Sequence, residues 1–310
     1  MNTKLRRALV LTPNLMVLGA FVWAVEHYWG WGRLFAPWRH LAPSLAVLAI
    51  VGMLVSYVLR AARIYLAERD IPRGQFLQSL RLVLISNVFN LLLPMRSGEA
   101  SFPILMRRWF GTHVGHATGT LLWLRLLDLH VLAAIGVVCA SAGWLGDSSG
   151  IADWALAIAA LCVAAPGVAY ALRGRIGAWT AAHPGRLAGL LGKMLQGLPR
   201  QLRGLGRDIA LTWLAWGVKL ASLGIVLAHL AKLPLALGVL GAIGGDLSTV
   251  LPIHAPGGFG TYEAGVLVLL APAHAPTPEL LAAAVNLHLL LLTTALVAGA
   301  IAWLAPRPRR

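Results

Sequence analysis

Charged residues are scarce in this chain: they make up 12% of its 310 residues, and only 11 residues are Asp or Glu. Soluble domains carry about 25% charged residues, which help to cover a water-exposed surface. Hydrophobic residues supply 58% of the chain, and the mean hydropathy is +0.75. The composition therefore argues against an ordinary soluble domain and predicts an all-α protein that crosses a bilayer several times.

Several chemical motifs are missing as well. The two cysteines, Cys139 and Cys162, both lie in apolar runs, so no disulfide framework is predicted. The ten histidines show no helix-spaced pair with a third ligand, which argues against a metal site. The segment GLLGKM has the wrong spacing for a Walker A motif and lacks Ser or Thr after Lys193. We therefore predict no metal and no cofactor.

Basic residues outnumber acidic ones 26 to 11, which gives a net charge of +15. In a soluble protein this excess would suggest nucleic-acid binding, but here Lys and Arg lie in short segments between apolar runs. The positive-inside rule and anionic lipid headgroups account for that pattern, so we predict no nucleic-acid partner and a cell-membrane protein with cytoplasmic termini. The residues assigned to the cytoplasmic side are Lys4, Arg6, Arg7, Arg60, Arg63, Arg69, Arg73, Arg107, Arg108, the basic residues from Arg173 to Arg207, and Arg307, Arg309 and Arg310.

Apolar runs of the length needed to cross a bilayer, roughly 20 residues, predict six spans. The first run follows a basic cluster but is too long for the apolar part of a signal peptide, so we expect it to be a retained span. The six runs lie near residues 8–25, 41–59, 117–142, 151–172, 209–230 and 280–304.

Two further apolar regions, 76–106 and 235–271, are interrupted by Pro and Gly. Each limb has about 15 residues and would span only about 22 Å as a helix, which favours re-entrant hairpins over full crossings. When the basic segments are kept in the cytoplasm, the two hairpins enter from opposite sides.

The whole chain, 1–310, is predicted to be one integral membrane domain with an inverted repeat. The first repeat covers 41–142 and the second 209–304, with a basic cytoplasmic linker at 173–208 between them. Transporters often use this plan, in which paired broken segments meet near the midplane and form the substrate site. The alternative is an accidental similarity between two Pro/Gly kinks.

Seven charged residues lie inside apolar segments, where an ionised group costs roughly 2.5–3.5 kcal/mol at mid-bilayer. We expect them to converge on a shared polar cavity. Arg125 and Asp128 are three apart and share a helical face, so a purely structural ion pair is an alternative for them. The seven residues are Arg81, Arg96, Glu99, Arg125, Asp128, Asp246 and Glu263.

The two breaks, NLLLPMRSGEASF at 90–102 and TVLPIHAPGGFGTYEAG at 249–265, follow one pattern. A proline ends the first limb, glycines allow the turn, and a glutamate lies in the first turn of the second limb. The helix dipole favours an acid there, so a capping role competes with a substrate role for each glutamate. Supporting candidates in the breaks are Pro94, Gly98, His254, Pro256, Gly257 and Gly258.

Three segments, NVFNLLLPMRSGEASFPILMRR, LLWLRLLDL and LPIHAPGGFGTYEAGVLVLL, resemble the transmembrane (flippase) region of the lysylphosphatidylglycerol synthase family, including its stand-alone members. Most of the chain from about residue 45 to 300 is covered by the likeness, which implies a lipid-translocating domain. It also implies functional roles for Arg96, Glu99, Arg125, Asp128, Pro256, Gly257, Gly258 and Glu263.

The soluble aminoacyl-transferring domain of the full synthases has no counterpart in this sequence, so the resemblance gives no grounds for expecting lipid aminoacylation. Stand-alone relatives are associated with varied lipids, including polyprenyl-linked sugars and hopanoids. The resemblance therefore leaves the substrate open.

The leading functional hypothesis is a transporter, not an enzyme, that moves the polar headgroup of a membrane lipid or lipid-linked substrate between leaflets. An ion or proton gradient, or the lipid gradient itself, would drive it. The alternative is an intramembrane lipid-modifying enzyme or an accessory subunit of a lipid or glycolipid transferase. A homo-oligomer or a partner from lipid biosynthesis is left open.

Overall fold

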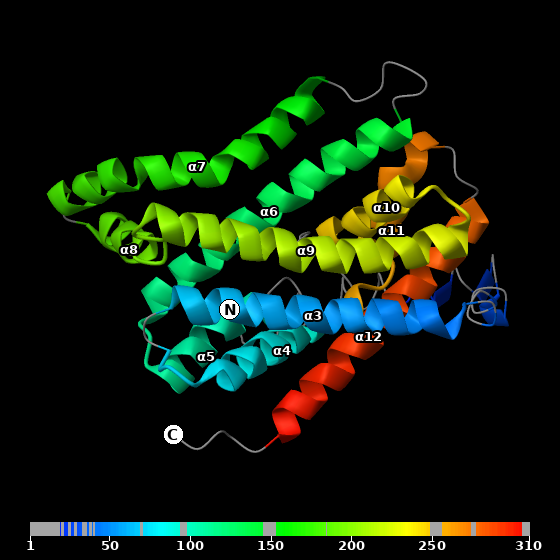
Figure 1. The fold of residues 1–310 in the computed structure, drawn as a ribbon, viewed down its shortest axis with the longest axis horizontal. Coiled ribbons are helices and arrows are strands. Elements are labelled where there is room, and N and C mark those ends of the chain that lie inside the picture. The colour runs from blue at the N-terminus through cyan, green and yellow to red at the C-terminus, as the bar shows by residue number, and fades with distance from the viewer. Residues whose placement is uncertain are drawn as a thin grey trace.

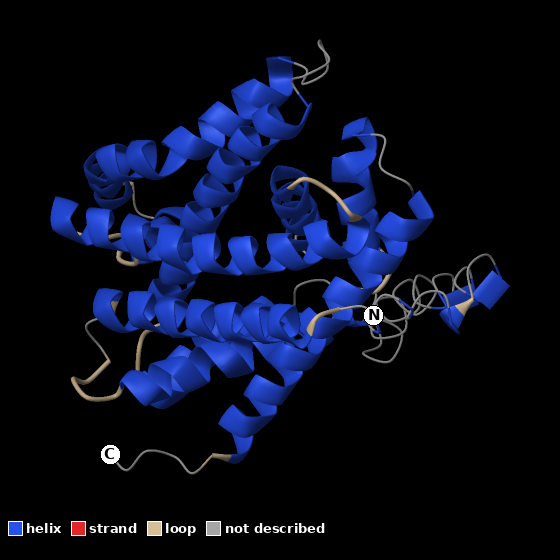
Figure 2. Ribbon diagram, turned by 45° about the vertical axis from the view of Figure 1, so that its right-hand side comes forward, coloured by secondary structure: helices blue, strands red, loops and turns tan. Residues whose placement is uncertain are grey.

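The computed structural model describes residues 41–68, 71–93, 98–144, 153–183, 185–248, 256–273 and 277–305, with isolated positions between 19 and 39. Within these ranges the chain forms helices and connecting loops, and none of the described residues lies in a strand (Figure 2). The all-α prediction is therefore confirmed for this part of the chain.

Ten α-helices follow one another through the region from residue 43 onward, with two short 3₁₀ turns in the second half (Figure 1). Their bounds are α3 Pro43–Ala67, α4 Phe76–Leu92, α5 Ser101–Phe110, α6 Val114–Trp144, α7 Asp153–Ala182, α8 Arg186–Leu195, α9 Leu202–Ala231, α10 Leu235–Ser248, η4 Pro256–Gly258, α11 Thr261–Leu270, η5 Ala271–Ala273 and α12 Thr277–Leu304.

Five helices of the described chain are long and apolar enough to cross a bilayer: α3, α6, α7, α9 and α12. They correspond to five of the six predicted spans, and the sixth, 8–25, lies largely outside the described residues. The observed helices extend beyond the apolar runs. In particular, α7 continues to Ala182 and α9 begins at Leu202, so most of the predicted linker 173–208 is helical.

The two predicted hairpin regions each contain two shorter helices. The limbs α4, α5, α10 and α11 have 17, 10, 14 and 10 residues, which is less than the roughly 20 that a full crossing needs. In Figure 1 the pair α4–α5 lies in the left half of the molecule, whereas α10–α11 lies in the right half.

Local sequence explains where these short helices end. Leu93 leaves the helical region with φ −90° and ψ 131°, as expected for a residue that precedes a proline in the sequence. At the other end of the pair, Gly111 closes α5 with φ 74°, a left-handed conformation that glycine adopts without strain.

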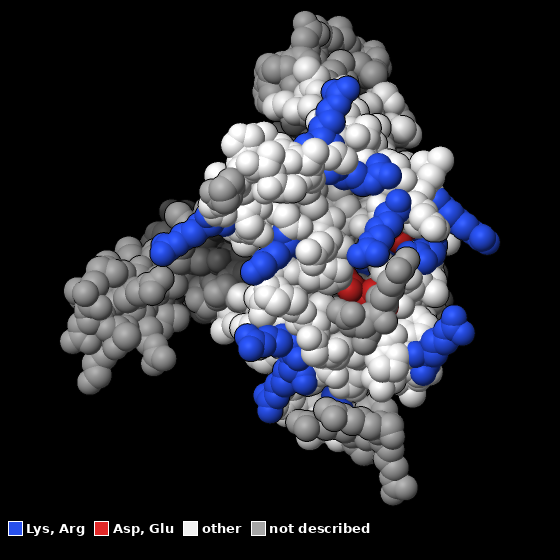
Figure 3. Space-filling view, turned by 90° about the vertical axis from the view of Figure 1, so that its left-hand side faces the viewer, with Lys and Arg blue, Asp and Glu red and all other residues white. Residues whose placement is uncertain are grey.

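The basic connections gather at one end of the molecule. The α3–α4 connection, the end of α5 and the α7–α8–α9 connections lie together on the left of Figure 1. Viewed from that side, Lys and Arg side chains are spread over the surface, with few acidic atoms visible (Figure 3). This distribution follows the charge bias expected of a multi-pass membrane protein.

Small residues allow the second helix pair to pack closely. A Cβ atom on Gly244 of α10 would lie 2.4 Å from the carbonyl oxygen of Gly265 on α11, and one on Gly265 would lie 2.3 Å from the carbonyl oxygen of Gly244. The two backbones therefore touch directly, as small residues permit in membrane helices.

We expect Gly244→Ala to cost about 1–3 kcal/mol, because the added methyl group meets rigid backbone and not a flexible side chain. The control is Gly217→Ala in α9, where an added Cβ meets nothing within 4 Å and where alanine is the better helix former. Thermal unfolding in detergent should show a lower Tm for Gly244→Ala alone. Equal Tm values for the two variants would contradict this close packing.

Candidate functional site

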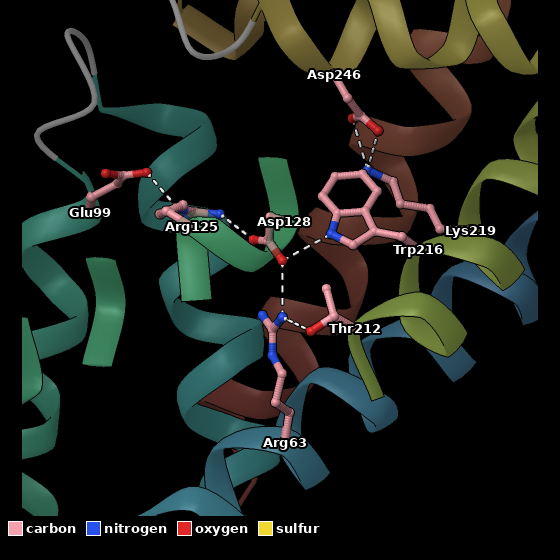
Figure 4. A network of polar contacts seen from close by, with 8 residues as sticks. All are labelled: Arg63, Glu99, Arg125, Asp128, Thr212, Trp216, Lys219 and Asp246. Atoms are coloured by element: carbon pink, nitrogen blue, oxygen red, sulfur yellow. Dashed lines mark hydrogen bonds and ion pairs between the residues drawn. The ribbon is translucent and has the colours of Figure 1, made fainter. Parts of the chain in front are cut away.

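The carboxylate of Asp128, on α6, joins three helices in the interior (Figure 4). Its Oδ1 accepts hydrogen bonds from Arg63 Nη1 of α3 at 3.1 Å and from Trp216 Nε1 of α9 at 2.9 Å. Its Oδ2 accepts one from Arg125 Nη1, one turn earlier on α6, at 3.2 Å. Arg63, Arg125 and Trp216 are therefore all tied to one acid.

The ion pair between Arg63 and Asp128 is shielded from solvent, with side-chain exposures of only 4% and 8%. Arg63 Nη1 also donates to Thr212 Oγ1 at 2.6 Å, which anchors the guanidinium to α9. Breaking such a buried pair by removing one partner is strongly destabilising, because the other charge stays buried. The pair thus fixes α3, α6 and α9 relative to one another.

Glu99 connects this centre to the first break. Its Oε1 lies 2.9 Å from Arg125 Nε, so Arg125 bridges Glu99 and Asp128 (Figure 4). The preceding Gly98 lets the chain fold back on α4, because a Cβ there would lie 2.2 Å from the carbonyl oxygen of Phe89. The sequence prediction that Glu99, Arg125 and Asp128 lie together agrees with this geometry.

Asp246 of α10 reaches the same region through Lys219 of α9. Lys219 Nζ lies 2.8 Å from both carboxylate oxygens of Asp246 and 4.9 Å from the ring centroid of Trp216. The indole therefore contacts Lys219 through its ring and Asp128 through its N–H group. One tryptophan joins the two ion-pair groups.

Arg60, one turn before Arg63 on α3, contributes a fourth cation. Its Cζ lies 4.5 Å from the ring centroid of Trp216. Its Nε and Nη2 atoms are buried and have no hydrogen-bond partner among the described residues. Two donors of this guanidinium are therefore available to an acceptor that the described chain does not supply.

We call this group the central charge network. Within the described chain it holds four cations and three carboxylates, an excess of one positive charge inside a membrane-embedded helical bundle. Its members are Arg60, Arg63, Glu99, Arg125, Asp128, Trp216, Lys219 and Asp246, with Thr212 as an anchor.

Glu263 lies in a separate cluster at the start of α11. Its Oε2 accepts a hydrogen bond from the backbone N–H of Gly260 at 2.7 Å, so it does cap the helix. Its Oε1 lies 2.8 Å from His288 Nδ1 of α12, and both side chains are only 2% exposed. The His288 ring stacks on Tyr262 at 4.2 Å, and the Tyr262 hydroxyl is buried with no hydrogen-bond partner among the described residues.

The remaining predicted residues fall into two groups. Arg81 is on α4, where it contacts Trp303 and Trp109 and not the central charge network. Pro256, Gly257 and Gly258 form the 3₁₀ turn before α11, and both glycines have positive φ, 75° and 80°. Pro94, Arg96 and His254 lie outside the described residues.

The sequence analysis placed Arg60 and Arg63 on the cytoplasmic side, just after the span predicted near 41–59. Their side of the membrane stays a prediction, but the helix extends further than that apolar run. Helix α3 continues to Ala67, and Arg63 is buried against Asp128. The signal was present in the sequence, because the two arginines are three apart and apolar residues follow them.

Two further residues of these clusters, Lys219 and His288, were not predicted from the sequence. Lys219 sits in the middle of an apolar span in the sequence, which marks an intramembrane charge that needs a partner. His288 carries no such signal, since a lone histidine in an apolar helix predicts no particular contact. Within the described ranges, His, Cys, Asp and Glu residues do not gather in threes that could hold a metal ion.

A family profile described as the lysylphosphatidylglycerol synthase TM region matches residues 8–299, which is nearly the whole chain. The chain belongs to this family. Membership agrees with the multi-pass helical architecture. No curated protein and no solved structure matches the chain.

Arg125 and Asp128 should behave as one energetic unit. We expect Asp128→Ala to cost about 3 kcal/mol or more, because it leaves the arginines around it without their shared acid. In a double-mutant cycle, Arg125→Ala and Asp128→Ala should be less than additive in unfolding free energy.

The control acid for this cycle is Glu279, which is exposed in the first turn of α12. Glu279→Ala should cost less than about 1 kcal/mol and add independently to Asp128→Ala. Strict additivity between Arg125→Ala and Asp128→Ala would contradict a coupled network.

Proposed function

We propose that the protein translocates an amphiphile with an anionic headgroup, such as a phosphate-bearing lipid or lipid-linked sugar, between the leaflets of the cell membrane. The central observation in support is Arg60, which has two buried, unpartnered donors in a network with an excess positive charge. An arginine fork matches the geometry of a phosphate, and an anion would neutralise the excess charge.

The arrangement of the short helices supports a transport role. We propose that α4–α5 and α10–α11 are re-entrant hairpins that enter from opposite sides, within a plan of six spans and cytoplasmic termini. Inverted broken helices around a midplane site are a recurrent plan of secondary transporters. The two pairs would then rock against each other around the central charge network.

Each hairpin has a glutamate that links its break to a long helix. Glu99 pairs with Arg125 of α6, and Glu263 pairs with His288 of α12. Breaking and remaking these contacts would change how each hairpin sits against the long helices. A proton exchanged at the Glu263–His288 pair would couple this movement to a proton gradient.

The test is leaflet exchange in proteoliposomes of the purified chain, using phosphatidylglycerol with a fluorophore on its acyl chain. Arg60→Gln should slow exchange about tenfold or more at equal folded protein, because it removes the donors offered to the phosphate. The control Arg175→Gln removes an exposed arginine of α7 and should leave the rate unchanged.

Mass analysis of the same lipid distinguishes transport from chemistry. A lipid of unchanged mass that has changed leaflet supports translocation, whereas a changed mass would support the alternative of an intramembrane lipid-modifying enzyme. Equal exchange rates for wild type, Arg60→Gln and protein-free liposomes would overturn the proposal.

A further inference from the structure

A cavity of about 610 Å³ lies between α4, α5 and the end of α12, separate from the central charge network. We call it the lateral cavity. Its α4 wall consists of Arg81, Ile85 and Phe89, which are spaced four apart and so share one helical face. Helix α5 forms the opposite wall, and Trp303 of α12 contributes at the edge.

One end of the lateral cavity is basic. Arg81 is near the start of α4 and Arg108 near the end of α5, and these two helix ends lie on the same side of the molecule (Figure 1). This is also the side on which the basic connections gather (Figure 3). The cavity therefore has its cations at the level expected for lipid headgroups.

The guanidinium of Arg81 is only partly satisfied. Its Nη2 donates to the backbone carbonyl of Trp303 at 3.0 Å, and its Cζ lies 5.8 Å from the ring centroid of Trp109. Its Nε and Nη1 atoms are buried and have no hydrogen-bond partner among the described residues. The guanidinium is thus held by the protein on one side and offers two donors on another, an arrangement suited to an oxyanion.

The other end of the lateral cavity is apolar and open to the side. Phe89, Leu93 and Ala100 line it next to the first break. Ile104 also lines the cavity and is 58% exposed, so the wall continues to the lipid-facing surface. Acyl chains could therefore lie in this end without leaving the membrane.

A further polar group lies toward the apolar end, next to Ala100 at the start of α5. The hydroxyl of Ser101 is buried in the cavity wall without a hydrogen-bond partner among the described residues. It precedes Arg108 by seven residues on α5, a rise of about 10 Å. An ester carbonyl below a phosphate is an acceptor that this hydroxyl could satisfy.

The geometry points to a binding site for one anionic glycerophospholipid in the lateral cavity. Its phosphate lies against Arg81, an ester group reaches Ser101, and an acyl chain runs along Phe89 and Ile104. The site is distinct from the central charge network, and binding there does not require that the protein translocate lipid. A resident lipid would fill the space between the first hairpin pair and α12.

Photolabelling of the full-length protein in detergent micelles tests this site directly. The probe is phosphatidylglycerol with a diazirine on one acyl chain, and labelled peptides are mapped by mass spectrometry. We expect labels on α4 and α5 residues between 85 and 104. Phosphatidylglycerol should compete with the probe, whereas phosphatidylcholine with the same chains should compete at least about tenfold less well.

Two variants with matched controls identify the contacts. Arg81→Gln should reduce labelling of α4 and α5 about tenfold, whereas Arg73→Gln, in the exposed loop before α4, should not change it. Ile104→Trp should block the apolar end, whereas Leu66→Trp, at an exposed position of α3 that does not line the cavity, should not.

Four results would overturn the proposal. The first is labelling outside α4 and α5, and the second is equal competition by phosphatidylcholine and phosphatidylglycerol. The third is displacement of the probe by glycerol phosphate, which has no acyl chains. The fourth is equal labelling of each variant and its control. Because binding alone is measured, these results are independent of the leaflet-exchange assay.

Discussion

A carboxylate buried among arginines is the constraint on which this structure depends. Asp128 receives Arg63 from α3, Arg125 from its own helix and the indole of Trp216 from α9. Within an apolar bundle an unpaired charge is costly, so the helices that carry these groups must stay in register. Two of the shorter segments contact these long helices through ion pairs. Glu99, just before α5, pairs with Arg125 of α6, and Asp246 of α10 pairs with Lys219 of α9.

The need to pair buried charges bears on function as well as on stability. The buried ion pair between Arg63 and Asp128 holds helices together, and only the Nε of Arg63 has no hydrogen-bond partner among the described residues. Arg60 departs from this pattern because two of its donors face no acceptor in the described chain. Arg81 in the lateral cavity departs from it in the same way. We propose that both arginines attract anions, Arg60 in the central charge network and Arg81 at the level of the lipid headgroups.

Much of the architecture could be predicted because it follows from helix length and from proline and glycine. Apolar runs predicted the five helices that are long enough to cross a bilayer. The proline after Leu93 marks the end of α4, and the glycines at 257 and 258 mark the turn before α11. The grouping of Glu99, Arg125 and Asp128 was also predictable, since isolated charges in apolar segments need partners.

The ion pairs between different helices could not be predicted, because they depend on which way each side chain points after the helices have packed. The apolar residues after Arg63 indicate that the helix continues, but they do not show whether the side chain turns inward to Asp128 or extends to the headgroups. The pairing of Lys219 with Asp246 and of Glu263 with His288 joins different helices, so it follows from tertiary packing alone. For Glu263 the structure shows the predicted capping contact and, in addition, a contact with His288 that the sequence did not predict, while its substrate role stays a prediction.

The most direct measurement is an experimental structure of the protein in a lipid nanodisc that contains an anionic phospholipid. A phosphate oxygen within about 3 Å of Arg60 Nε or Nη2 is the result expected for a transport site at the central charge network. The opposite result would be an Arg60 guanidinium whose donors are all satisfied by protein groups, with lipid headgroups found only at the membrane surface.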